Sequence, residues 1–184
     1  MKISTRSITL AATLTALCAV TGLLPYVFFL PVAVAATTLS LGMVAFVGLA
    51  FGCISLLYCF TVPMSPVALA FVQAPYIPII PRVLAAVGAY GVCALMKRFV
   101  KQDTNFKRVV TVAVPAATAS LLNTALVVGL LALVMPDADL GGITVLLYVP
   151  TMLISGAIEF CCMAALTPPI SLTLNRVVLN GRRK

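Results

Sequence analysis

Long apolar segments, separated by short polar or proline-rich ones, dominate the chain. Several of them reach the roughly 20 residues that an α-helix needs to cross a bilayer, and they lack the alternation of a barrel strand. The pattern predicts about six spanning helices. Five of them lie at residues 8–24, 32–49, 82–96, 109–135 and 143–174. The third in chain order runs from a turn at Gly48–Gly52 to residue 62. The sequence therefore predicts an all-α, polytopic membrane protein with one transmembrane domain over residues 1–184.

Proline and glycine mark the ends of the predicted spans. Pro25 ends the first span, which we interpret as a helix and not a cleaved signal, because the apolar stretch 8–30 exceeds a typical signal core. A short turn at Gly48–Gly52 predicts that the second and third spans form a hairpin. Residues 63–81 read PMSPVALAFVQAPYIPIIP, and their repeated prolines predict an irregular loop at the membrane edge. This loop is either a lid over a cavity or a plain interfacial connector.

The distribution of basic residues predicts the orientation. With six spans and a cytoplasmic N-terminus, eleven of the twelve Lys and Arg residues fall in cytoplasmic segments. The largest internal group lies at 97–108, whereas the turn at 136–142 carries two of the four acidic residues. The positive-inside rule then places both termini in the cytoplasm. Arg82 is the exception and needs another explanation.

Composition narrows the classes of function. The chain is 62% hydrophobic and 9% charged, which excludes an ordinary soluble domain. Its net charge of +8 comes from residues at span ends, not from a basic face with aromatics, so no nucleic acid is expected. The six cysteines lie in apolar runs without histidine or C-x-x-C spacing and read as packing residues. Without paired carboxylates, a nucleophile elbow or a P-loop, we expect no enzyme, no metal and no cofactor.

Arg82 is the first candidate binding residue. It follows Pro81 near the predicted outer end of a span, where its charge could simply reach the interface. A guanidinium in this place also offers a fork that matches a carboxylate in two parallel hydrogen bonds. Ala86 and Tyr90 share its helix face, so a small residue would leave space between the charge and an aromatic wall.

Other polar groups in apolar surroundings are further candidates. Glu159 is the one acid well inside a predicted span, either in a pocket or as a structural partner of another helix. Asn123 could bind a polar ligand group or bond a neighbouring helix. Gln73, Tyr76 and Phe71, in the proline-rich segment, could supply hydrogen bonds and an aromatic cover.

Small residues on the first span suggest a contact surface. Ala12 and Ala16 lie four positions apart on one stripe, which allows close approach of another helix. Ordinary packing within the chain would need the same pattern, so the residues alone leave both interpretations open.

Several of these segments resemble the S components of energy-coupling-factor (ECF) transporters, over essentially the whole chain. They are the alanine stripe A-x-x-x-A, the segment ending I-P-R-V-L, the run S-L-L-N-T-A-L-V-V-G, and the final-span motifs G-A-I-E-F and L-T-P-P-I. The match is nearest to the group that includes the pantothenate, folate and cobalamin subunits. The resemblance implies a substrate-capture subunit of a bacterial cell membrane importer, without enzymatic activity of its own.

The same resemblance implies partners and roles for residues. A vitamin, with pantothenate favoured, would bind at the outer face, and Arg82, Asn123 and Glu159 would form its pocket. Ala12 and Ala16 would dock on a transmembrane coupling protein that carries two cytoplasmic ATPases.

Other functions remain open at this point. Folate, cobalamin or another vitamin is an alternative ligand. For folate, Tyr90, Tyr148 and Phe71 could stack on the pterin. A membrane scaffold that binds no ligand, and a permease that works without ATPases, are alternatives from other classes.

Overall fold

The computed structural model describes residues 5–24, 26–61, 67–100, 104–136 and 144–180. This part of the chain forms a bundle of seven helices: α1 (Thr5–Thr21), α2 (Leu30–Thr38), α3 (Leu41–Thr61), α4 (Ala68–Gln73), α5 (Tyr76–Phe99), α6 (Asn105–Val134) and α7 (Val145–Asn180). Four of them, α3, α5, α6 and α7, are long and apolar enough to cross a membrane, and α1 is a shorter apolar helix. The all-α, multi-pass membrane architecture predicted from the apolar pattern is therefore confirmed.

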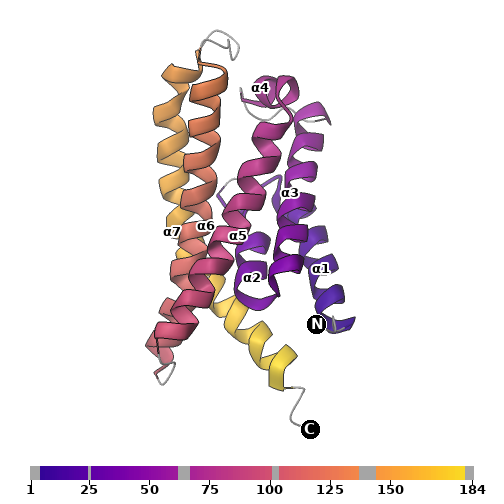
Figure 1. Ribbon diagram of the computed structural model, residues 1–184, viewed down its shortest axis with the longest axis vertical. Helices are drawn as coiled ribbons and strands as arrows, with labels where there is room; N and C mark the ends of the chain where they lie inside the picture. The colour runs from indigo at the N-terminus through magenta and orange to yellow at the C-terminus, as the bar shows by residue number, and fades with distance from the viewer. Residues whose placement is uncertain (1–4, 25, 62–66, 101–103, 137–143, 181–184) are drawn as a thin grey trace.

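The long helices run up and down, so that α1 begins and α7 ends at the same end of the bundle (Figure 1). The end of α5 and the beginning of α6 lie at this end too, whereas α4, the end of α6 and the beginning of α7 lie at the other. We call the end where α1 begins and α7 ends the basic end. The described basic residues other than Arg82 all lie in the helix ends that form it. They are Arg6, Lys97, Arg98, Lys107, Arg108 and Arg176.

The predicted hairpin at Gly48–Gly52 is wrong, because α3 continues through both glycines. The chain breaks earlier, around Leu39, and leaves α2 as a separate helix of nine residues. A Cβ atom on Gly48 would lie 2.9 Å from the Cβ of Ala86, and one on Gly52 would lie 3.0 Å from the Cα of Ile79. The glycines therefore let α3 and α5 approach closely, a role that small residues often have between membrane helices.

The proline-rich segment is more helical than predicted. It contains α4, and α5 begins at Tyr76, six residues before the predicted start. Pro78 lies in the first turn of α5, where backbone N–H groups have no helical acceptor, so only Pro81 removes a bond from the helix. The predictions at Pro25, at 63–66 and for most of the 136–142 turn fall outside the described residues.

The short helix α2 fills the middle of the bundle toward the basic end (Figure 1). Seven of its nine residues are buried, which shows that neighbouring helices surround it. Lys97 Nζ donates to the carbonyl oxygen of Thr37 at 2.9 Å, and the hydroxyls of Thr37 and Ser171 lie 2.8 Å apart. At 1.5 Å per residue α2 is about 14 Å long, roughly half the hydrocarbon thickness. The other half of the bundle therefore has no central helix.

The last helix bends around this centre. Pro150, Pro168 and Pro169 lie inside α7, and the last two remove adjacent backbone hydrogen bonds. Figure 1 shows α7 beside α6 in its first part and turning away from it toward the basic end. The second part of α7 reaches α2 through Ser171. Its first part is left to line the half of the bundle that α2 does not fill.

Candidate functional site

A cavity of about 550 Å³ lies in the half of the bundle that α2 leaves open. Its walls come from the α1–α2 connection, the second half of α3, α4, the beginning of α5, the second half of α6 and the first half of α7. These segments all lie toward the end opposite the basic end (Figure 1). The volume is within the range of small-molecule sites, about 300–1,000 Å³.

Arg82 brings a buried cation to the cavity wall. Its side chain is only 6% exposed, and its Nη1 donates to the carbonyl oxygen of Pro78 at 2.5 Å, one turn earlier in α5. Its Cζ lies 5.2 Å from the ring centroid of Phe51 and 5.8 Å from that of Phe71. The guanidinium is thus fixed by its surroundings, and its buried Nε–H group has no acceptor among the described residues.

Three further buried polar side chains lie close to one another on α6 and α7. Asn123 and Glu159 line the cavity and are 5% and 3% exposed, and Ser120 lies beside the Glu159 carboxyl group. Asn123 Oδ1, Glu159 Oε1 and Ser120 Oγ make no hydrogen bond of ordinary geometry among the described residues, although Ser120 lies within interaction distance of the Glu159 carboxyl group. Leaving such groups unpaired costs about 1–3 kcal/mol each, more for a charge. A ligand that donates hydrogen bonds would recover part of this cost.

Arg82 and Glu159 form no direct salt bridge within the described chain, although each lies within the other's electrostatic reach. The cavity therefore offers a positive group on α5 and a carboxyl group on α7. This arrangement suits a ligand with an acidic group at one position and hydroxyl or amide donors at another.

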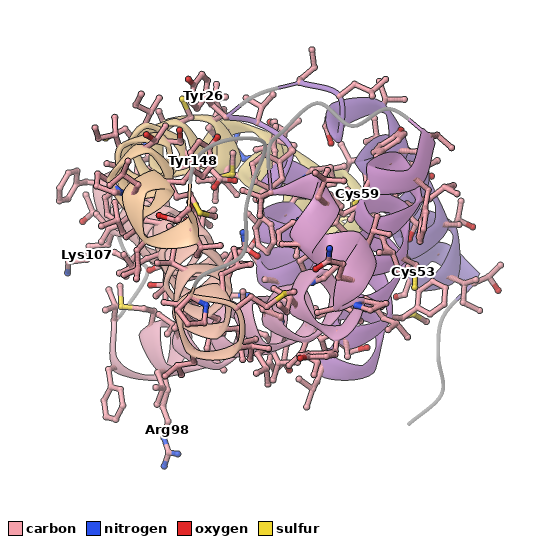
Figure 2. All side chains as sticks on the ribbon, turned by 90° about the horizontal axis from the view of Figure 1, so that it is seen from above. Tyr26, Cys53, Cys59, Arg98, Lys107 and Tyr148 are labelled. Carbon is pink, nitrogen blue, oxygen red and sulfur yellow. The ribbon has the colours of Figure 1, made fainter. Side chains whose placement is uncertain are left out.

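Aromatic and aliphatic side chains form much of the remaining wall. Phe28, Phe71 and Tyr148 line the cavity together with Val127. Tyr26, also on the wall, has φ 66°, a left-handed conformation that is uncommon for a residue with a side chain. Seen from above, Tyr26 and Tyr148 lie on one side of the molecule and Cys59 toward the other (Figure 2). The site therefore combines a few polar groups with a largely apolar enclosure, as small-molecule sites usually do.

The structure brings four of the predicted site residues together on one cavity: Arg82, Asn123, Glu159 and Phe71. It does not bring Gln73, Tyr76 or Tyr90 to the wall.

The positions of these last three residues explain the difference. Gln73 ends α4 with an exposed side chain, and Tyr76 begins α5 with 45% of its surface exposed. Tyr90 lies two turns beyond Arg82, where it packs against the core that surrounds α2. Their role as ligand contacts stays a prediction, without support from the position of their side chains.

Tyr58 and Cys59 are wall residues that were not predicted. Tyr58 and Cys59 reach the cavity from α3, and the Tyr58 hydroxyl donates to the carbonyl oxygen of Ala19. In the sequence both lie in an uninterrupted apolar run, without a polar pattern that would separate a cavity face from a lipid face. Ser155 lines the cavity one turn before Glu159, and Thr124 follows Asn123, so each polar residue has a small hydroxyl neighbour.

The alanine stripe lies on the outside of α1. Ala12 and Ala16 are exposed, whereas Ala11, Leu14 and Cys18 form the buried face of the same helix. The stripe is therefore not used for packing within the described chain, and its role in docking a partner stays a prediction.

Comparison with known proteins adds no family to this picture, because no family model and no curated protein matches the chain.

Proposed function

We propose that this protein is the substrate-binding S component of an ECF-type importer in a bacterial cell membrane. One observation carries the proposal. A buried arginine, an amide and a carboxyl group, all drawn from the motifs of the family resemblance, line one cavity in the half of the bundle away from the basic end.

The proposed topology follows from the arrangement of the helices. In this topology the four long helices, α1 and the short α2 would be six membrane segments, with the beginning of α1 and the end of α7 on the same side. Basic residues at that side mark it as cytoplasmic under the positive-inside rule. The cavity then lies in the outer half of the membrane, where a capture subunit would receive its substrate.

Pantothenate is the ligand that the cavity chemistry favours. Its single carboxylate fits the Arg82 guanidinium, and its hydroxyl and amide groups supply donors and acceptors for Asn123 and Glu159. Folate is the alternative, since Phe71 and Tyr148 provide aromatic wall. Cobalamin, a macrocycle several times larger than pantothenate, is the weaker alternative, because a cavity of about 550 Å³ would hold only part of it.

Uptake would depend on partners. The sequence has no P-loop that could bind ATP, so energy would come from a transmembrane coupling protein with two cytoplasmic ATPases. The exposed stripe of Ala12 and Ala16 on α1 is the surface that we assign to this coupling protein.

The experiment is native mass spectrometry of the detergent-purified protein, followed by calorimetric titration of the ligand-free form with pantothenate, folate and cobalamin. We expect one tightly bound molecule of pantothenate. Binding of folate alone would correct the ligand and keep the class. No binding across the panel would refute the assigned substrates and favour a scaffold whose buried polar groups are only structural.

A further inference from the structure

Phe51 lies behind the cavity and not on its wall. It is 1% exposed, in the middle of α3, and it belongs to the core that surrounds α2. Its ring nevertheless lies 5.2 Å from the Cζ atom of Arg82. A ring beneath a cation attracts it through the negative face of the π-system, and the attraction strengthens when water is excluded. Phe51 is therefore placed to act on the ligand site through Arg82.

Neighbouring rings hold Phe51 in place. Phe28 stacks on it with centroids 5.9 Å apart and an interplanar angle of 28°, and Phe29 meets it edge-on at 5.6 Å and 77°. Phe28 and Phe29 belong to the segment that leads into α2, and Phe29 is itself fully buried. The ring that supports Arg82 is thus fixed by packing and cannot readily move away.

Ring contacts constrain a guanidinium in a particular way. The group is planar, with its N–H donors at the edge, so an aromatic ring over its face does not use up any donor. Phe71 on α4 makes a second ring contact at 5.8 Å, and Pro78 accepts from Nη1. Together these contacts hold the group while Arg82 Nε stays without a partner among the described residues.

We propose that Phe51 is a positioning residue for the ligand site: with Phe71 it holds the Arg82 guanidinium, which lines the cavity, in the orientation that receives a ligand carboxylate in a bidentate fork. The ligand class is a small monocarboxylate, and this part rests on the proposed function. The positioning itself does not, because the ring contacts with Arg82 are made within the protein.

Fluorinated phenylalanines introduced at position 51 test the proposal with little change in the size of the side chain. Each added fluorine weakens the negative face of the ring. We expect the Kd for pantothenate to rise stepwise, by roughly three- to thirtyfold at trifluorophenylalanine. The same series at Phe29, which is equally buried but makes no ring contact with Arg82, is the matched control and should leave Kd unchanged. An equal effect at both positions, or none at position 51, would overturn the role of Phe51.

A ligand-independent readout separates this inference from the proposed function. In ¹⁵N-arginine NMR of the detergent-solubilised protein, Arg82→Lys identifies the Arg82 Nε–H signal by its loss. We expect that signal to lie apart from those of the other arginines in the wild type because of the ring currents. Trifluorophenylalanine at position 51 should move the signal and broaden it, whereas the same residue at position 29 should not.

The two failures are then distinguishable. A responsive Arg82 signal without binding of any vitamin would keep the positioning role and reject the proposed substrates. An Arg82 signal that does not respond to position 51 would reject the positioning role, whatever the protein binds.

Discussion

Arg82→Ala is the substitution that separates a ligand-binding cavity from a purely structural polar cluster. The change removes the guanidinium, which is the positive group among the described residues of the cavity wall. A ligand carboxylate would then lie in a cavity with few other hydrogen-bond donors. A hydrogen bond to a charged group contributes about 1.5–3 kcal/mol, and a bidentate contact has two of them. We therefore expect the substitution to cost about 3–5 kcal/mol of binding free energy, a loss of roughly a hundredfold to several thousandfold in affinity.

The assay is calorimetric titration of the purified protein with pantothenate. Arg82→Lys should fall between the wild type and Arg82→Ala, because an ammonium keeps the charge but loses the planar fork. Arg98→Ala is the matched control, since Arg98 lies in the last turn of α5 at the basic end, with its side chain pointing away from the bundle (Figure 2). It should leave the affinity unchanged.

The stability of the variant must be followed in parallel. Among the described residues, Arg82 makes one hydrogen bond and two ring contacts, and its removal also takes away a buried charge. We expect these opposing effects to leave the protein folded, with a monodisperse elution profile in detergent. A folded Arg82→Ala variant that binds pantothenate as tightly as the wild type would refute the assignment of Arg82 to the carboxylate.

Three further predictions follow from other contacts. Gly48→Val should destabilise the protein by about 1–3 kcal/mol, because the new side chain meets α5. Gly42→Ala is the control and should not lower the thermal midpoint, because a Cβ there meets nothing within 4 Å. Equal midpoints for the two variants would contradict the close approach of α3 and α5. Leucine at both Ala12 and Ala16 should abolish co-purification with the coupling protein and spare pantothenate binding; loss of binding as well would make them core residues. Glu159→Gln keeps a hydrogen-bond acceptor and should weaken pantothenate binding less than tenfold. Glu159→Leu loses the acceptor and should weaken binding more than tenfold in the same titration. Equal losses of affinity would show that Glu159 does not contact the ligand.

The hydrophobic pattern predicted the membrane class and most of the helices, because a lipid-exposed helix must be apolar over its full length. It did not locate the break before α3. Glycine signals a turn and a close helix contact equally well, and only the approach of α5 to Gly48 decides between them. The prolines of α5 misled for a similar reason, since Pro78 lies in a first turn that tolerates it.

The charged and amide members of the cavity were predictable, and most of the apolar ones were not. Arg82, Asn123 and Glu159 stand out because a polar group inside a membrane span is costly unless it has a partner or a ligand. Tyr58 and Phe51 carry no such signal, because an apolar side chain is equally at home facing lipid, core or cavity. Their roles depend on which face of α3 turns inward, and that follows from the packing of α3 against α5.

The most direct test of the central claim is uptake of labelled pantothenate into proteoliposomes that contain this protein together with an ECF coupling protein and its two ATPases. The account predicts uptake that requires ATP and all of these components, and that is lost with Arg82→Ala while Arg98→Ala retains it. Uptake by this protein alone, or no uptake by the complete assembly despite normal assembly, would contradict it.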